Sequence, residues 1–181
     1  MSFAFNEDQK LLAESADRFI LNDYKFEGRR KIMAMDGGFD KSKWKKFADL
    51  GWLALPIPEE YGGLGGSTVD TAVLLESFGR GLVVEPYQST IVLGAAAIVA
   101  GGSLEQKKSI LRDVAEGNKL IAFAHSEPRS RFNIKHVELT AIEDGGNYKL
   151  NGQKAVVHNA ETADIIIVSA RTDGGLSDET G

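Results

Sequence analysis

The stretch LALPIPEEYGGLGGSTVDTAVLLESFGR, residues 53–80, decides the fold of this 181-residue chain. Pro56 and Pro58 end the preceding helix, because proline has no backbone N–H and clashes with the previous turn. The run GGLGG follows, and glycine reaches backbone conformations that other residues avoid. Ser67 then caps a new helix, with Asp70 as its capping-box partner. The stretch therefore predicts a rigid turn that joins two helices.

Residues 1–118 carry the periodicity and capping signals of an all-α helical bundle. Asn6 with Gln9, and Ser103 with Gln106, are further cap pairs. Glu76 and Arg80 are four residues apart and are expected to pair on a helix surface or between domains, not to act as a catalytic dyad. The expected helices follow Asn6, cover 26–35, follow Asp40, cover 68–79, cover 91–100 and follow Ser103.

The helix expected over residues 91–100 is apolar on every face. Such a helix is typical of a bundle centre or of an oligomer interface. We interpret it as core rather than as a substrate tunnel, although one face could do both.

From residue 119 the pattern changes to short strands, expected at 121–124, 137–141, 148–150, 155–158 and 165–170. The run DGGN at 144–147 is expected to turn the chain into the strand at 148–150, and Asn151-Gly152 is a further hairpin-turn signal. The fold class is therefore α+β: a helical domain over 1–118, then a partial middle β domain, a partial β-barrel, over 119–181. So small a sheet has open edges, so we expect a sequence cut within a longer protein. A sheet edge that is covered by other residues or paired in a dimer would explain the small sheet equally well.

Bulk composition narrows the classes of function. The net charge is −5, and no polybasic patch favours nucleic acid as a partner. The longest apolar run, 91–100, is too short for membrane insertion, which takes about 20 residues. The N-terminus lacks the basic and apolar regions of a signal peptide. With no cysteine, the composition fits a cytoplasmic protein.

No self-sufficient catalytic constellation is present. None of the three histidines stands at metal-ligand spacing with another histidine, and there is no cysteine ligand, so no metal site is expected. Glu59 and Glu60 are interpreted as solvated loop charges. His125 is expected to face away from Ser126 and to be structural.

Three segments carry a family resemblance: residues 53–80, AFAHSEP at 122–128, and NGQKAVVHN at 151–159. They resemble the acyl-CoA dehydrogenases, and GRGLVVEPY at 79–87 is most similar to the small subunit of pimeloyl-CoA dehydrogenase-type enzymes. The resemblance implies further strands and a C-terminal helical bundle, both missing from this sequence. The catalytic glutamate lies in that bundle, so the catalytic residue is unknown here and the fragment itself is expected to be inactive.

The resemblance implies an FAD-dependent oxidoreductase of fatty acid metabolism that removes a proton from Cα and a hydride from Cβ of an acyl-CoA substrate. It implies an electron-transfer acceptor protein as partner and a homo- or hetero-oligomer. Ser126 matches a flavin-bonding threonine of the family. The residues implied for FAD are Phe123, Ser126, Val157 and His158, and those implied for substrate are Arg131 and Phe132.

The sequence also departs from the family pattern at this surface. Arg131 and Phe132 stand in a stretch where the family has Gly-Ser-Asp, Val156 replaces a stacking aromatic, and His158 replaces a threonine. His158 could equally be a structural histidine. Arg129 and Arg131 could grip a CoA phosphate or a substrate carboxylate, or could equally lie in a solvated loop. Two alternatives stay open: a flavin-free structural partner subunit of a heteromeric enzyme, and a flavin-dependent oxygenase on the same scaffold.

Overall fold

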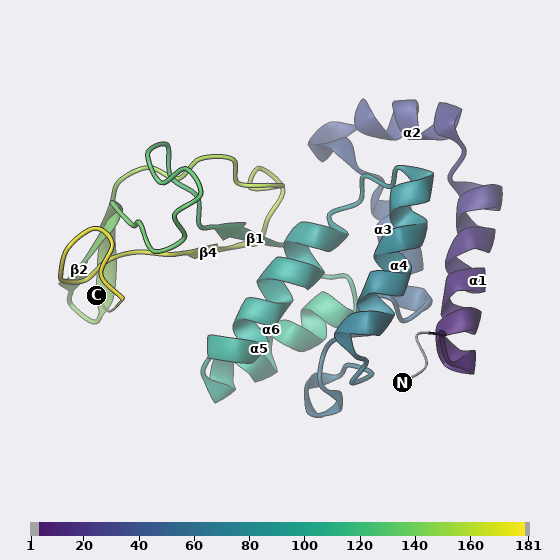
Figure 1. Ribbon diagram of the computed structural model, residues 1–181, viewed down its shortest axis with the longest axis horizontal. Coiled ribbons are helices and arrows are strands. Elements are labelled where there is room, and N and C mark those ends of the chain that lie inside the picture. The colour runs from purple at the N-terminus through teal and green to yellow at the C-terminus, as the bar shows by residue number, and fades with distance from the viewer. Residues whose placement is uncertain (1–3, 180–181) are drawn as a thin grey trace. The chain divides into compact units, whose positions relative to one another are not determined.

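The computed structural model describes residues 4–179, which form two compact units divided between Leu120 and Ile121. Figure 1 shows the first unit as helices and the second as short strands joined by long loops. The α+β fold class is confirmed. Each unit has its own core, so each is described by itself.

The first unit contains six α-helices in which α1 packs against α4 and α5 packs against α6 (Figure 1). Three shorter elements connect them: the 3₁₀ turns η1 (Asp36–Gly38) and η2 (Glu59–Tyr61), and the π-helical segment η3 (Gln88–Ala95). The α-helices are α1 (Glu7–Asp23), α2 (Phe26–Met33), α3 (Lys41–Asp49), α4 (Thr68–Gly81), α5 (Ala96–Gly101) and α6 (Leu104–Ala115).

The predicted capping signals are confirmed at the starts of α1, α4 and α6. Each of these helices has a complete capping box, in which the cap side chain and the side chain three residues later satisfy each other's backbone N–H groups. Asp40 caps α3 by accepting a hydrogen bond from the amide of Ser42 at 2.8 Å. Local sequence therefore fixes where these helices begin.

An aromatic cluster forms the core of the helical unit. Phe47 stacks on Phe78 with 5.0 Å between ring centroids, and Trp52 lies 5.1 Å from Phe47. Phe19 meets Trp52 edge to face, and the Tyr87 hydroxyl donates a hydrogen bond to the Trp52 carbonyl at 3.1 Å. All five rings are nearly or fully buried, so this cluster ties α1, α3, α4 and η3 together.

The turn between α3 and α4 needs glycine for close packing. A Cβ on Gly63 would lie 1.8 Å from the Ile57 carbonyl oxygen, far inside van der Waals contact. The Gly63 amide meanwhile donates to the Pro58 carbonyl at 3.1 Å. The sharp, rigid turn predicted from the two glycine pairs is what the chain forms.

The helix expected at residues 91–100 is present, but within this chain it is not buried on every face. The segment is a π-helix, η3, that continues directly into α5. Leu93, Ala96 and Ala100 are exposed, whereas Ile91 and Ala95 are buried. A uniformly apolar composition hides which face is covered, because it gives no periodic signal.

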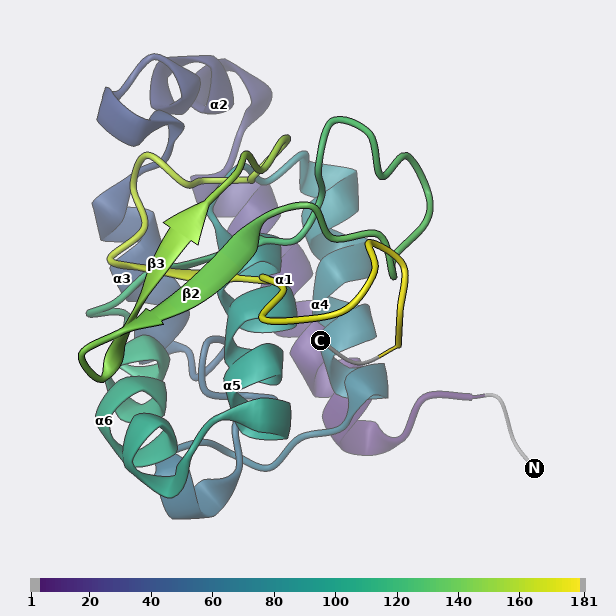
Figure 2. The ribbon, with the colours of Figure 1, turned by 90° about the vertical axis from the view of Figure 1, so that its left-hand side faces the viewer.

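The second unit holds two separate two-stranded sheets rather than a closed barrel, within the residues described. β1 (Ile121–Ala124) pairs in parallel with β4 (Ile165–Val168), placing Phe123 opposite Ile167. β2 (Thr140–Asp144) and β3 (Asn147–Asn151) form an antiparallel hairpin, seen face on in Figure 2.

Two expectations about this unit need correction. The hairpin turns at Gly145-Gly146, both with positive φ, as expected for residues 144–147, whereas no hairpin turn forms at Asn151-Gly152, where β3 ends. Residues 155–158 are not a strand: 153–157 are irregular and a turn begins at His158. Val156 has φ +53°, in the left-handed region, which breaks any strand despite its β-branched side chain.

Candidate functional site

The segment AFAHSEP, residues 122–128, begins in strand β1 and continues into a loop. β1 ends at Ala124, and the amide of Ser169 donates to the Ala124 carbonyl at 3.2 Å, which continues the pairing with β4. The Phe123 and His125 rings stack with centroids 5.9 Å apart and planes 5° apart, on one face of the chain. Ser126, of the opposite parity, is exposed, as the alternation predicts.

The segment NGQKAVVHN lies directly beside AFAHSEP. The Ala155 amide donates a hydrogen bond to the Ser126 carbonyl at 2.8 Å. Val157 is half-buried and His158 is exposed, two and three residues beyond this bond. Residues about 30 positions apart in sequence thus meet, although through irregular backbone rather than through neighbouring strands.

A buried ion pair fastens the same two segments. Lys154 Nζ lies 2.7 Å from Glu127 Oε1, with side chains only 6% and 1% exposed. Lys154 also donates to Ser169 Oγ at 2.9 Å and to the His125 carbonyl at 3.3 Å. Sequence reasoning missed this pair, since opposite charges 27 residues apart leave no periodic trace. The signal in the sequence was that Glu127 lies in AFAHSEP and Lys154 in NGQKAVVHN, two segments that also carry the family resemblance.

Both carboxylate oxygens of Glu127 accept hydrogen bonds. Its Oε2 accepts from the Glu138 amide at 2.6 Å, and its Oε1 accepts from the Leu139 amide at 3.0 Å. Burial by itself raises the pKa of Glu127, but the hydrogen bonds from Lys154 and from the two amides outweigh it and hold the pKa below its usual range. Glu127 is therefore a structural anion, which suits it for positioning and not for proton transfer.

Glu127, His136 and Glu138 form the one cluster within residues 4–179 that could hold a metal ion, with a ligand atom of each within 4.8 Å of the others. His136 Nε2 and Glu138 Oε1 are already 2.8 Å apart, and the Lys154 ammonium lies against Glu127. A cation would have to displace that ammonium, so the donor set does not favour a metal. The expectation of no metal site was based on histidine spacing, which missed this cluster.

The residues that depart from the family pattern are exposed, and two have unusual backbone. Phe132 is entirely exposed and Val156 is 79% exposed. Arg131 has φ +49°, in the same left-handed region as Val156. Non-glycine residues in this region store strain, and such strain is concentrated at functional sites. The surface near AFAHSEP and NGQKAVVHN therefore combines strained backbone with exposed apolar side chains.

The chemistry of these residues fits a flavin. An isoalloxazine ring needs an apolar face and hydrogen-bond donors at its edge. Phe123 and Val157 are half-buried apolar side chains, while Ser126 and His158 are exposed polar ones, on two segments joined by a hydrogen bond.

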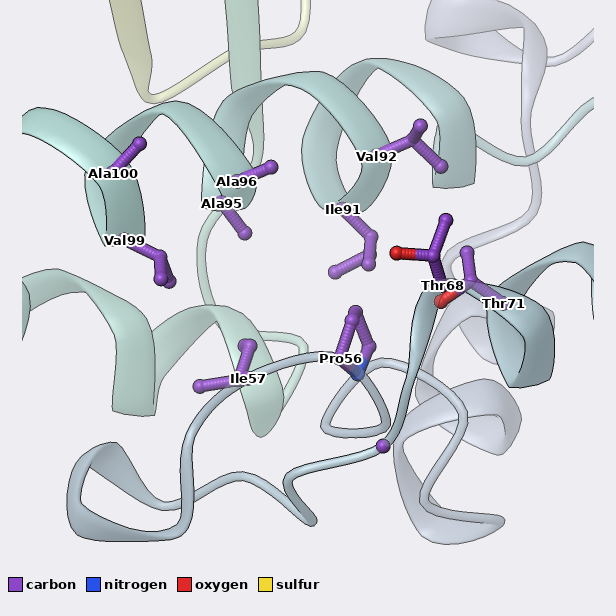
Figure 3. Close-up of a pocket in the computed structure, with 11 residues that line it drawn as sticks. Pro56, Ile57, Thr68, Thr71, Ile91, Val92, Ala95, Ala96, Val99 and Ala100 are labelled. Carbon is purple, nitrogen blue, oxygen red and sulfur yellow. The ribbon is translucent and has the colours of Figure 1, made fainter.

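The helical unit has an apolar pocket of about 340 Å³ (Figure 3). Ile91, Ala95 and Val99 point from η3 and α5 toward Pro56 and Ile57 of the interhelical turn, and two threonines of α4 lie at one end. Its lining carries no charged side chain. The helix interpreted as core thus also lines a pocket.

No helix in the part of the chain that the structure describes combines the length and apolarity needed to cross a membrane.

The chain matches known proteins over nearly its whole length. Residues 6–118 match the sequence profile of the acyl-CoA dehydrogenase N-terminal domain, and residues 122–180 match that of the middle domain. A probable acyl-CoA dehydrogenase of Bacillus subtilis, YngJ, is 31% identical over 95% of this chain and 45% of its own length. Mitochondrial isovaleryl-CoA dehydrogenase of Bos taurus is 29% identical over 93% of this chain and 40% of its own length.

Solved structures agree with these matches. One is the ChsE4–ChsE5 complex of Mycobacterium tuberculosis, with a TM-score of 0.82 and 28% identity over 96% of this chain and 44% of that chain. Another is an FAD complex of PigA, with a TM-score of 0.81 and 27% identity over 97% of this chain and 46% of that chain. The chain spans less than half the length of these relatives. The profile matches to both domains carry the conclusion that this chain belongs to the acyl-CoA dehydrogenase family.

Proposed function

We propose that this chain supplies flavin and substrate contacts to an FAD-dependent acyl-CoA dehydrogenase that oxidises the Cα–Cβ bond of an acyl-CoA. The observation that carries the proposal is the hydrogen bond from the Ala155 amide to the Ser126 carbonyl, which holds the two flavin-associated segments together. We keep the domain boundary between residues 118 and 119 and a cytoplasmic location as parts of this proposal.

In this proposal Phe123 and Val157 cover an apolar face of the bound flavin, and Ser126 and His158 offer hydrogen bonds to its edge. When bound, FAD supplies the acceptor for the hydride from Cβ. Donors aimed at a site of developing negative charge stabilise it without rearranging. The role of this chain is thus to bind and orient, while the base that removes the Cα proton is supplied from outside these residues.

Arg131 and Phe132 are proposed to contact the substrate. A guanidinium binds phosphate or carboxylate oxygens through paired N–H donors. Phe132, the next residue in the chain, offers a fully exposed aromatic ring. Relatives named as complexes, such as ChsE4–ChsE5, support an oligomeric enzyme, and we include an electron-transfer protein as the acceptor that reoxidises it.

A second candidate, a flavin-free structural subunit of a heteromeric enzyme, is favoured by one observation. Val156, which stands where the family has a stacking aromatic, is 79% exposed and in strained backbone. An aliphatic side chain on left-handed backbone offers no ring to stack on a flavin. The two candidates differ in whether this subunit retains FAD.

The test is the FAD content of the full-length protein, purified with any partner, and of its Ser126→Ala variant. A hydrogen bond to a charged group is typically worth about 1.5–3 kcal/mol, so we expect FAD retention to fall by about tenfold or more. Ser109→Ala, which removes an exposed hydroxyl on α6, is the matched control and should retain FAD. A flavin-free wild type favours the structural subunit. Unchanged retention in Ser126→Ala refutes this placement of the cofactor.

A further inference from the structure

The buried Glu127–Lys154 pair connects several segments of the second unit. Lys154 has three N–H donors, and its three acceptors belong to Glu127, to Ser169 just after β4, and to the backbone of His125. Glu127 in turn accepts from the backbone of the two residues just before β2. Four segments distant in sequence therefore meet at one ammonium–carboxylate pair.

Stability alone does not explain a pair of this kind. Removing two charges from water is unfavourable, and well-packed apolar residues in place of a buried ion pair are often as stable or more so. What an ion pair adds is directional geometry, because all three N–H donors of Lys154 and both oxygens of Glu127 have defined partners. A completely satisfied polar network holds its segments in one arrangement.

The geometry that this pair fixes is that of Ser126. The Lys154 ammonium bonds the carbonyl of His125, the residue before Ser126, and Glu127 is the residue after it. The next residue after Lys154 donates its amide to the Ser126 carbonyl. Ser126 is thus exposed at its hydroxyl but held by backbone contacts on both sides.

We infer that Lys154 and Glu127 are positioning residues, which set the direction of the Ser126 hydroxyl for hydrogen bonding to a bound flavin. This inference rests on the proposed function. Neither residue touches the ligand in this view: both act through the backbone of residues 125–127. A side chain that acts only through another loses its effect once that other side chain is gone.

The test is a double-mutant cycle on FAD retention in the full-length protein, with its partner where one is present. Lys154→Met keeps an unbranched apolar stem and removes the ammonium; we expect it to reduce retention by about tenfold. If Lys154 acts through Ser126, Lys154→Met adds little to Ser126→Ala, so the double variant resembles the single ones. The flavin absorbance spectrum, a second readout, should shift in the same way in all three.

Two variants complete the design. Lys149→Met removes an exposed lysine of the hairpin, paired with Asp144, and should retain FAD fully. Glu127→Gln keeps the volume and one acceptor oxygen, so it gives a folded alternative if Lys154→Met fails to fold, and it should also be non-additive with Ser126→Ala. Circular dichroism reports folding independently of the flavin.

The outcomes separate the two claims. Additive losses, or full retention in Lys154→Met and Glu127→Gln, overturn the positioning role while leaving the proposed function standing. A wild type that retains no FAD overturns the proposed function and this inference with it. Non-additive losses in folded variants support both.

Discussion

Gln9 Nε2 donates a hydrogen bond to Asp70 Oδ1 at 2.9 Å, which joins the first turn of α1 to the first turn of α4. Each of these residues is also the reciprocal partner in its own helix's capping box. The hydrogen bond from Gln9 is the largest influence on Asp70, and together with Ser67 it holds the pKa of that carboxyl below its usual value despite partial burial. Two local capping signals thus form one tertiary contact.

Asp70→Ala should reduce the free energy of unfolding by about 1–2 kcal/mol, because it removes the capping box of α4 and the contact with Gln9 together. Urea denaturation at neutral pH measures this. Val69→Ala, an exposed neighbour in the same turn, serves as the control and should change stability by less than about 0.5 kcal/mol. Equal effects in the two variants would mean that the cap contributes nothing measurable.

Gly63→Ala should prevent the native turn between α3 and α4, because its Cβ would overlap the Ile57 carbonyl oxygen. We expect a loss of about 3 kcal/mol or more in the free energy of unfolding. Gly79→Ala is the matched control: it lies within α4, and a Cβ there meets nothing within 4 Å. That variant should be neutral or more stable by up to about 1 kcal/mol. Thermal unfolding of both variants shows whether the loss comes from the steric clash at Gly63 or from replacing any glycine with alanine.

Arg131→Gln tests the substrate half of the proposal. Removing the guanidinium should raise KM for an acyl-CoA by roughly fivefold with little change in kcat, since a phosphate or carboxylate far from the reacting carbons binds equally in the ground and transition states. Steady-state kinetics on the full-length enzyme give the two constants. Arg30→Gln, an exposed arginine on α2, should leave both unchanged. An unaltered KM in Arg131→Gln would remove that residue from the substrate site.

The helical unit was largely predictable from sequence, because its signals are local. Ser67 and Asp70, like Ser103 and Gln106, lie three residues apart and mark the start of a helix on their own. Local signals did not predict which face of residues 91–100 is buried, because a uniformly apolar run is compatible with both buried and exposed faces.

The second unit was less predictable, because tertiary contacts override local preference there. Asn151-Gly152 has the composition of a hairpin turn, but Gly152 serves to let the backbone approach Leu139, where a Cβ would come within 2.6 Å of Cα. Val156 has high strand propensity, yet its backbone is left-handed next to the segment that Lys154 anchors. The Glu127–Lys154 pair could not be predicted from sequence, because only the folded chain brings these two residues together.

The buried Glu85 provides a prediction about pH. It is 5% exposed, and among the described residues neither carboxyl oxygen has a hydrogen-bond partner within ordinary distance. Burial is the main influence and raises the pKa of Glu85, although the nearby Tyr24 hydroxyl, the Asp40 amide and the charge of Lys43 each work the other way. The folded state therefore holds the Glu85 proton more tightly than the unfolded chain does.

The sign of the pH dependence follows from linkage. Since the folded pKa is the higher one, the contribution of Glu85 to stability is fully present below the unfolded value of about 4.3, and it is lost as pH rises through the folded value. Over that window stability should fall by up to about 1.4 kcal/mol per pH unit from this group. Glu85→Gln cannot ionise, so it should abolish this part of the slope and be more stable than wild type at pH 8. Urea denaturation from pH 4 to 8, with the exposed Glu14→Gln as control, measures the difference. Parallel curves for wild type and Glu85→Gln would mean that folding does not raise the pKa of Glu85.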